Sequence, residues 1–380
     1  QAHTAILARG LGLPAIVAAK GVTEIADGTI VYVESNEGIV DTEPTDADRE
    51  AAIKYANRKP VADFDGQGVL ADGTRVELYA NVGDGKSAEK AASLKAEGVG
   101  LLRTEFGFLG HDSEPSIETQ AKTYKSVFDA FPGKHIVVRT LDAGADKPLP
   151  FLNVNPEENP ALGVRGFRTD WTVPGVLTRQ LEAIKAASED SDADIWVMAP
   201  MISTTSEARN FANMLKEIGL PVHGVMVETP AAVMNAEAIL GEVDFVSIGT
   251  NDLTQYTMAA DRLLGDLAHL NNPWQPAVLK MIKMTVEGAQ RASVTAGKKK
   301  YVSVCGEAAA DPALAVVLIG LGVDTLSMNA GAIPAVAAVL KSVTKEKAQQ
   351  IAAIALQQIS SAEAKESARQ ALPILDELGL

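Results

Sequence analysis

Eight short apolar runs, separated by helix-forming stretches, constrain the fold of this 380-residue chain more than any other feature. The runs lie at 76–82, 98–102, 135–138, 195–199, 224–227, 245–248, 302–304 and 325–328. They are continuous and rich in Val and Ile, which indicates strands buried on both faces, as in parallel sheets covered by helices. Eight such strands with intervening helices favour a closed (β/α)₈ barrel of the TIM type, an α/β fold, and an open doubly wound sheet is the alternative.

The stretches between these runs are rich in Ala and have helical periodicity, as at 87–97 and 205–218. Asp72-Gly73, just before the first run, predicts a tight turn of a hairpin. After the eighth run, residues 345–380 are expected to be helical and to pack on the barrel or on a second subunit.

The beginning of the chain has too few residues for a core of its own. Residues 1–44 predict a helix that begins near His3, a short strand and a hairpin, and chains below about 40 residues seldom fold unaided. A helix capped near Thr45 or Asp46 follows and ends before Pro60. Because the chain does not begin with Met, we expect a fragment of a longer protein. The expected division is a domain remnant at 1–44, a helical linker at 45–64 and the barrel at 65–380.

The charge balance argues against nucleic acid or an anionic membrane surface as a partner. The chain has 34 basic and 49 acidic residues, a net charge of −15, which repels nucleic acid and anionic membrane surfaces. The densest basic run, 298–300, is expected to be a solvated surface. No apolar run reaches the roughly 18 residues that a membrane span needs. The single cysteine excludes an intrachain disulfide and fits a reducing, cytoplasmic location.

Polar residues gather where the predicted strands end. They are Arg103-Thr-Glu105, Arg139-Thr-Leu-Asp142, Glu228, Gly249-Thr-Asn-Asp252 and Cys305-Gly-Glu307. In (β/α)₈ barrels the catalytic groups lie just past the C-terminal ends of the strands, at one face of the barrel. A single arginine at a strand end is ordinarily a structural or surface ion pair. Several polar strand ends at the same face favour an active site.

Two of these residues are carboxylates that follow consecutive strands. Glu228 and Asp252 are therefore expected to converge at the barrel mouth. Two hard oxygen donors without His or Cys nearby suit Mg²⁺ or Mn²⁺, with water and substrate oxygens completing the coordination. The alternative is a pair of buried acids bonded to the backbone or to arginine.

Arginines add positive charge beside this pair of acids. The guanidinium groups of Arg103, Arg139 and Arg262 match phosphate and carboxylate oxygens in two-point geometry, which indicates a doubly anionic substrate. Arg165, on a long insertion after the third strand, is a further candidate. Its alternative role is a structural pairing with Arg168 at a helix start.

Two further residues have possible chemical roles. Cys305 is either a small buried hydrophobic residue or a reactive group, and its position at the rim favours a proton donor or a nucleophile. His3 opens a helix, where unpaired N–H groups and the helix dipole favour a phosphoryl group on the imidazole. A lone His at a helix start is otherwise a capping or surface residue.

Specific motifs are distributed between residues 3 and 340. They are His3-Thr-Ala-Ile-Leu-Ala-Arg9, Gly98-Val-Gly-Leu-Leu-Arg-Thr-Glu-Phe106, Asp146-Lys-Pro-Leu-Pro150, Asn159-Pro-Ala-Leu-Gly163, Val225-Met-Val-Glu-Thr-Pro-Ala-Ala232, Ser247-Ile-Gly-Thr-Asn-Asp-Leu-Thr-Gln-Tyr256, Asp261-Arg262 and Cys305-Gly-Glu307. In these motifs the chain resembles enzyme I of the bacterial sugar phosphotransferase system, the phosphoenolpyruvate-protein phosphotransferase family. The resemblance implies that the domain remnant ends a swivelling phosphohistidine domain and that the barrel binds phosphoenolpyruvate (PEP).

The resemblance also implies roles for single residues. His3 would be the phosphorylated residue, and Cys305 would protonate the enolate. The implied PEP-binding residues are Arg103, Arg139, Arg165, Asn251, Arg262 and Lys147. The implied ligands of Mg²⁺, with Mn²⁺ as the other possible ion, are Glu228 and Asp252.

The partners that the resemblance implies are PEP, a small histidine-containing phosphocarrier protein and a second copy of the chain bound through the barrel. We expect the helical subdomain that docks the phosphocarrier to lie outside these 380 residues. Two alternatives stay open from the sequence. One is a fragment of a pyruvate phosphate dikinase or PEP synthase, and the other is a PEP-sensing module without catalysis.

Overall fold

The computed structural model describes most of the chain. The described residues are 16, 19, 21–34, 38–56, 61–144, 149–152 and 156–380. His3, Lys147, the helix expected near His3 and most of the short strand expected after it lie outside the described residues.

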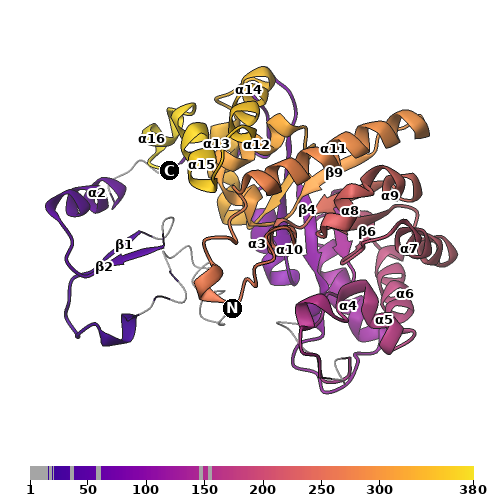
Figure 1. The fold of residues 1–380 in the computed structure, drawn as a ribbon. Coiled ribbons are helices and arrows are strands. Elements are labelled where there is room, and N and C mark those ends of the chain that lie inside the picture. The colour runs from indigo at the N-terminus through magenta and orange to yellow at the C-terminus, as the bar shows by residue number, and fades with distance from the viewer. Residues whose placement is uncertain are drawn as a thin grey trace.

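Eight parallel strands close into a barrel, which confirms the predicted (β/α)₈ fold (Figure 1). The strands are Glu77–Val82 (β3), Gly98–Arg103 (β4), His135–Arg139 (β5), Asp194–Ala199 (β6), His223–Val227 (β7), Phe245–Ile248 (β8), Tyr301–Val304 (β9) and Thr325–Met328 (β10). Neighbours in the chain are neighbours in the barrel, and β10 closes the barrel by pairing with β3. Each strand begins and ends within about one residue of its expected position.

Helices surround the strands and alternate with them along the chain (Figure 1). They are Gly85–Ser93 (α3), Ile117–Phe128 (α4), Thr169–Thr172 (α5), Val176–Glu189 (α6), Thr205–Ile218 (α7), Pro230–Met234 (α8), Ala236–Glu242 (α9), Thr250–Met258 (α10), Pro276–Ala296 (α11), Pro312–Leu321 (α12) and Ile333–Leu340 (α13). Short 3₁₀ turns complete several of the connections, among them Thr104–Gly107 and Glu307–Ala310 after β4 and β9.

The two helices expected from periodicity differ in outcome. The range 205–218 is confirmed as α7, whereas the helix expected at 87–97 begins and ends earlier, as α3. Asp84 caps α3, because its side chain accepts a hydrogen bond from the Ser87 N–H. Beyond the last turn, Lys95 has a positive φ of 61°, which a continuing right-handed helix excludes.

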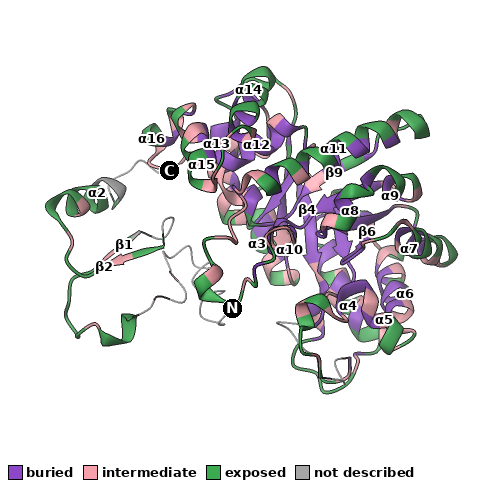
Figure 2. Cartoon of the chain, in the orientation of Figure 1, coloured by how far each residue is buried: buried purple, intermediate pink, exposed green. Residues whose placement is uncertain are grey.

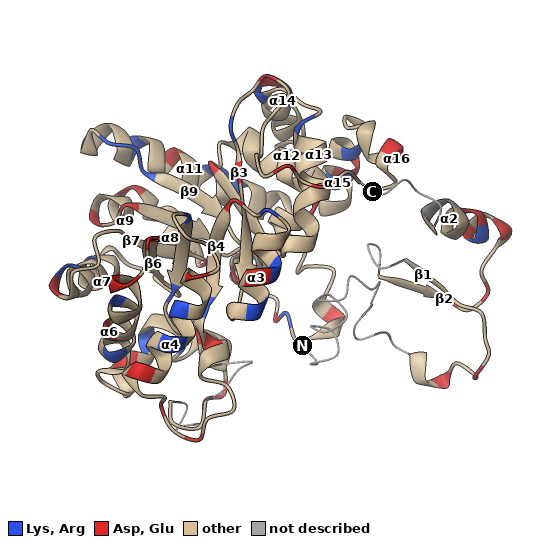
Figure 3. Ribbon diagram, turned by 180° about the vertical axis from the view of Figure 1, so that it is seen from behind, with Lys and Arg blue, Asp and Glu red and all other residues tan. Residues whose placement is uncertain are grey.

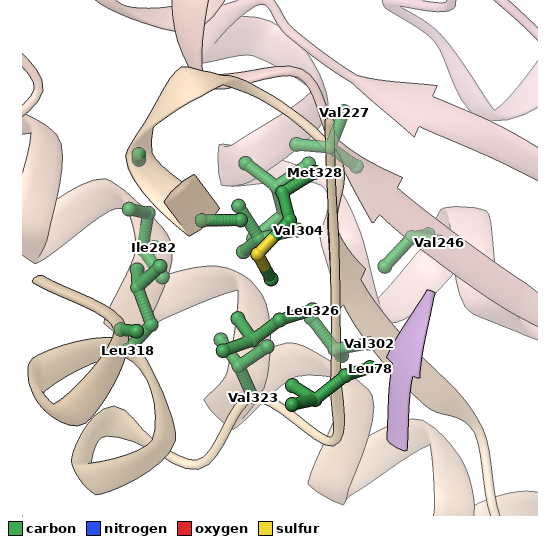
Figure 4. Packing of buried hydrophobic residues seen from close by; sticks show 14 of the residues in the cluster. Leu78, Val227, Val246, Ile282, Val302, Val304, Leu318, Val323, Leu326 and Met328 are labelled. Carbon is green, nitrogen blue, oxygen red and sulfur yellow. The ribbon is translucent and has the colours of Figure 1, made fainter. Parts of the chain in front are cut away.

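Alternate strand residues contribute to two apolar layers. On β6, Val197 packs into the large cluster between strands and helices, and its neighbour Met198 packs into a smaller cluster inside the barrel. Figure 4 shows part of the large cluster, where Leu326 of β10 lies beside Val302 of β9, and Ile282 of α11 lies beside Leu318 of α12. Buried residues concentrate on the strands and on the helix faces that cover them (Figure 2). The barrel interior is therefore filled and is not a pore.

Ion pairs connect the beginnings of neighbouring strands at the N-terminal face of the barrel. Asp244, just before β8, accepts a hydrogen bond from Lys298 Nζ at 2.6 Å and lies 2.9 Å from Nδ1 of His223 on β7. Lys299, just before β9, pairs with Asp324 at 2.6 Å. These contacts connect the beginnings of four successive strands, β7 to β10, and involve no residue of the opposite face.

The expectation that residues 298–300 form a solvated surface is only partly correct. The side chains of Lys298 and Lys299 are 61% and 56% exposed, but Lys300 is buried. Its Nζ donates a hydrogen bond to the Val243 carbonyl oxygen at 2.6 Å, and burial lowers the pKa of its amine. Elsewhere, acidic and basic positions occur together on outer helices such as α3, α4 and α6 (Figure 3).

The segment before the barrel forms the predicted hairpin and helix. Tyr32–Glu34 (β1) pairs with Ile39–Asp41 (β2) in antiparallel register, and Asp46–Ala56 (α2) follows (Figure 1, indigo). Thr45 caps α2 as predicted, because its Oγ1 accepts a hydrogen bond from the Asp48 N–H at 3.2 Å. No residue of this segment whose burial is described between 21 and 56 is buried, in keeping with a piece that lacks its own core (Figure 2).

The chain ends in three helices that pack on the barrel, which confirms one of the two expected locations. They are Lys345–Leu356 (α14), Ser361–Gln370 (α15) and Ile374–Leu378 (α16). α14 lies against α12, where a Cβ on Gly320 would come within 2.1 Å of the Ala348 carbonyl oxygen. Only glycine permits this approach. Of the helices in the described part of the chain, none is long and apolar enough to cross a bilayer.

We predict that Asp244→Asn lowers the free energy of unfolding by about 1.5–3 kcal/mol at pH 7, the range for a hydrogen bond to a charged group. Burial acts to raise the pKa of Asp244, but the contacts with His223 and Lys298 lower it well below its ordinary value. A lowered folded-state pKa stabilises the protein above the unfolded pKa of about 3.9, and this contribution is lost as the pH falls further.

The difference between wild type and Asp244→Asn should therefore shrink in urea unfolding as the pH is lowered below about 4. Asp192→Asn, a change at an exposed aspartate between α6 and β6, is the control and should change stability by less than about 0.5 kcal/mol. An equal loss in both variants would contradict the prediction.

Candidate active site

The polar strand ends meet at the C-terminal face of the barrel, as the sequence predicted. Arg103 and Arg139 end β4 and β5 and are register partners, so two arginines lie side by side. Glu228 directly follows β7, and Asp252 lies in the first turn of α10, after β8. Cys305 directly follows β9.

Three carboxylates and three arginines alternate across this face in one series of ion pairs, here called the acid–arginine chain. In order, its members are Glu105, Arg139, Asp142, Arg165, Asp252 and Arg262. The successive N···O distances are 2.8, 3.0, 3.0, 2.8 and 3.2 Å. A buried charge without a partner is strongly destabilising, and here each inner member has an opposite charge on both sides.

Burial differs along the acid–arginine chain. The side chains of Arg165 and Arg139 are 3% and 8% exposed, whereas that of Arg262 is 25% exposed. Burial acts to lower the pKa of Arg139, but the carboxylates of Glu105 and Asp142 raise it above its ordinary value. The buried arginines therefore stay charged at all relevant pH values.

Uncharged buried groups position the backbone beneath the acid–arginine chain. Gln180 of α6 accepts a hydrogen bond from the Leu141 N–H at 2.8 Å and donates one to Thr104 Oγ1 at 3.0 Å. Thr104 in turn donates to the Arg139 carbonyl oxygen at 2.9 Å. These bonds tie the ends of β4 and β5 to one helix, so that the two arginines of these strands share a rigid support.

Glu228 is fully buried, and its two carboxylate oxygens differ. Oε1 accepts a hydrogen bond from the Met201 N–H at 2.6 Å, and Oε2 has no hydrogen-bond partner among the described residues. Met201 has a positive φ of 59°, a strained conformation that turns its N–H toward the carboxylate. Burial is the largest cause that raises the pKa of Glu228 to about 8, with Asp252 and Asp142 adding to the rise.

The residues at this face fit a hard divalent cation. The unpartnered Glu228 Oε2 and the carboxylate of Asp252 are oxygen donors of the kind that Mg²⁺ and Mn²⁺ prefer. In the described part of the chain, no three His, Cys, Asp or Glu residues are close enough to form a metal site by themselves. Most of the coordination would therefore come from water and substrate oxygens, as is usual for Mg²⁺.

Both acids also make the contacts of the alternative interpretation. Asp252 is bonded to two arginines and Glu228 to the backbone. A cation at this face would thus compete with the arginine partners of Asp252, while Glu228 offers an oxygen that is already available.

Cys305 is fully buried at the mouth of the barrel. Its Sγ donates toward the Ile248 carbonyl oxygen at 3.7 Å, and its own carbonyl oxygen accepts a hydrogen bond from Asn81 Nδ2 at 2.8 Å. Burial is the main cause of the raised pKa of the thiol, although Arg139 and Ser247 act in the opposite direction. A thiol that stays protonated at neutral pH suits a proton donor better than a nucleophile.

The residues beside Cys305 connect β9 to α10. A Cβ on Gly306 would come within 1.9 Å of Thr250 Oγ1, so only glycine allows this approach. Asn251, a predicted substrate ligand, accepts a hydrogen bond through Oδ1 from the Glu307 N–H at 3.3 Å. The side-chain amide nitrogen of Asn251 belongs to the same rim as Glu228 and Asp252.

The structure assigns partners that the sequence did not. Glu105 and Asp142 were visible as strand-end acids, but neither was selected as a site residue. The guanidinium of Arg165 belongs to the acid–arginine chain, whereas that of Arg168 donates to the Gly163 carbonyl oxygen. The two residues are joined only through the backbone of a short 3₁₀ turn, where the Arg168 N–H donates to the Arg165 carbonyl oxygen at 3.2 Å. Tyr256, the last residue of the motif that begins at Ser247, contacts Arg165 through its hydroxyl at 3.4 Å. The sequence did not predict this contact.

Comparison with known proteins agrees with this geometry. Residues 61–345 match the family described as PEP-utilising enzyme, PEP-binding domain, and residues 1–38 match its mobile domain. The protein is therefore a (β/α)₈ barrel that carries a buried site of paired acids and arginines at its C-terminal face. The chain belongs to the PEP-utilising enzymes.

Relatives with assigned names are similar over nearly the whole chain. A phosphoenolpyruvate-protein phosphotransferase of Streptomyces coelicolor is 46% identical, over 97% of this chain and 66% of the relative. One of Haloferax volcanii is 39% identical, over 96% of this chain and 65% of the relative. A multiphosphoryl transfer protein of Xanthomonas campestris is 40% identical, over 93% of this chain and 43% of the relative. The chain spans about two thirds of the first two relatives.

We predict that Asp142→Ala lowers the free energy of unfolding by about 3–5 kcal/mol, because it leaves Arg139 and Arg165 without a shared buried partner. The control is Glu237→Ala, which breaks an ion pair with Arg291 whose side chains are 49% and 59% exposed. Exposed pairs contribute about 1 kcal/mol at most. Denaturant unfolding that gives equal losses in the two variants would show that the acid–arginine chain is not a buried network.

Proposed function

We propose that this chain is the PEP-binding, phosphoryl-transferring part of a phosphoenolpyruvate-protein phosphotransferase, enzyme I of the sugar phosphotransferase system. The observation that carries the proposal is the convergence of the acid–arginine chain, Glu228 and Cys305 at one face of a PEP-family barrel. The names of the relatives support this activity over that of a dikinase or a PEP synthase.

In this proposal the barrel binds PEP through its cations. PEP presents a phosphate and a carboxylate, which guanidinium groups match in two-point geometry. Arg103, Arg139 and Arg262 hold these groups, with Arg165, Asn251 and Lys147 as further substrate ligands. Glu228 and Asp252 would hold Mg²⁺ or Mn²⁺. The cation would supply Lewis-acid stabilisation of the developing negative charge.

The transfer step breaks the bond between phosphorus and the enol oxygen of PEP and forms a bond between phosphorus and Nε2 of His3. The arginines neutralise the phosphoryl oxygens during the in-line displacement. The enolate that leaves takes a proton on its terminal carbon from Cys305 and becomes pyruvate. The thiolate then regains a proton from solvent, which completes the proton balance.

The proposal assigns three parts to the chain. Residues 1–44 end the swivelling domain that carries His3, 45–64 link it to the barrel, and 65–380 form the PEP-binding barrel. His3 has to leave the barrel mouth to pass the phosphoryl group to a histidine-containing phosphocarrier protein, and a linker permits that motion. We also propose a homodimer through the barrel and a cytoplasmic location.

Asp252→Asn should reduce PEP-dependent pyruvate formation about 10²-fold or more, because the amide is a weaker metal ligand than the carboxylate. The amide oxygen can still accept from Arg165, so the fold should persist. The matched control is Asp192→Asn, the same change at an exposed site. The assay measures pyruvate and phosphoryl incorporation into His3 in the presence of Mg²⁺. A near-wild-type rate would rule out the metal assignment.

Cys305→Ala should slow pyruvate formation about 10²-fold while leaving the affinity for PEP within about twofold, because only the proton donor is removed. Binding of a phosphonate analogue of PEP, measured by calorimetry, separates the two effects. Ser303→Ala, two residues earlier on β9, is the control for a small change in the same strand. An unchanged rate in Cys305→Ala would show that Cys305 is only a small buried hydrophobic residue and not the proton donor.

A further inference from the structure

The carboxylate proposed to bind the metal is held by two guanidinium groups. Asp252 Oδ1 accepts a hydrogen bond from Arg165 NH1 at 2.8 Å, and Oδ2 accepts one from Arg262 NH1 at 3.2 Å. Both oxygens of a proposed cation ligand are therefore already bonded to positive charges. A cation that approaches Asp252 therefore competes with two guanidinium groups for the same negative charge.

The two arginines are not equally fixed. Arg165 is almost fully buried and makes two further bonds to Asp142, at 3.0 and 3.1 Å through NH2. Arg262 makes the longest contact of the acid–arginine chain, and its side chain is the most exposed of the three arginines. Displacing Arg262 thus disturbs less buried structure than displacing Arg165.

The backbone around Arg262 would allow the side chain to change its bonding partner. Arg262 lies beyond the end of α10, after Ala259, which has a positive φ of 49°. The Arg262 N–H donates to Gln255 Oε1 at 2.9 Å, so that the backbone is anchored to α10. An anchored backbone with a side chain that is 25% exposed would allow the guanidinium to move while the loop stays in place.

We propose that Arg262 is an exchangeable latch on Asp252, which makes the divalent cation and the anionic substrate bind cooperatively. The inference rests on the proposed function, because it assumes that both ligands use this face. A cation alone has to break the ion pair between Arg262 and Asp252. An anionic substrate alone leaves its oxygens facing the carboxylates of Asp252 and Glu228.

When both ligands bind, the charges exchange partners. Arg262 leaves Asp252 for a substrate oxygen, and the cation takes its place on the carboxylate. Neither charge is then left buried without a partner. The free-energy cost that each ligand meets when it binds alone is therefore reduced by the other ligand. Such linkage is reciprocal, and coupled sites typically change each other's affinity by about 5- to 150-fold.

The test measures the affinity of Mn²⁺ for the 380-residue chain, with and without a saturating phosphonate analogue of PEP. In wild type, the analogue should tighten Mn²⁺ binding about tenfold or more. Arg262→Met keeps the length of the side chain but removes the charge and the donors. This variant should bind Mn²⁺ alone at least about fivefold more tightly than wild type and show a smaller effect of the analogue.

Arg103→Met is the matched control, because it removes the same charge from the same face. Arg103 lies in register with Arg139, whereas Asp252 pairs with Arg165 and Arg262. A general loss of positive charge would tighten Mn²⁺ binding in both variants to a similar degree. The latch predicts that only Arg262→Met binds Mn²⁺ alone more tightly.

Two results would overturn the latch and leave the proposed function standing. They are unchanged or weaker Mn²⁺ binding in Arg262→Met, and an equal gain in Arg103→Met. A wild-type chain that binds neither Mn²⁺ nor the analogue would overturn both the latch and the proposed function. Thermal unfolding of each variant checks that a change in affinity does not come from lost structure.

Discussion

The site depends on the requirement that a buried charge must have a partner before any ligand arrives. Removing a carboxylate or a guanidinium from water costs several kcal/mol per ion unless an opposite charge compensates it. The acid–arginine chain meets this requirement by alternation, so that the arginines which suit an anionic substrate are neutralised within the protein. Under the proposed function, charged ligands at this face would exchange ion-pair partners with these six residues, among which no open cluster of like charge exists.

The two ends of the barrel both carry ion pairs, but these pairs serve different purposes. At the N-terminal face, Asp244 and Asp324 pair with Lys298 and Lys299, whose side chains are more than half exposed, and these pairs connect strand beginnings. At the C-terminal face the pairs are buried, so that their electrostatic interactions are less screened by water. The apolar cluster that contains Met198 fills the barrel between the two faces. One face can therefore stabilise the barrel while the other carries the chemistry.

The sequence predicted the strands well because β-branched, continuously apolar runs are local features that burial on both faces requires. The positions of Glu228, Asp252 and Cys305 followed from the rule that strand ends share one face. Helix ends were predicted less well, since the start of α3 depends on the Asp84 cap. Ion-pair partners could not be predicted, because Arg165 reaches Asp142 from 23 residues later in the chain. Only the folded loops decide which acid it meets.

The site contains charges that are held in place and, in our proposal, one charge that can change partners. Arg139 is held by Glu105, by Asp142 and through the backbone bonds that Gln180 supports, so it needs little rearrangement when charge develops on a substrate. If every arginine were fixed in this way, a cation would find both oxygens of Asp252 bonded to fixed positive charges, and only Oε2 of Glu228 would be available. Arg262, at the exposed end of the acid–arginine chain, supplies the one charge of that series that can leave with little loss of buried structure.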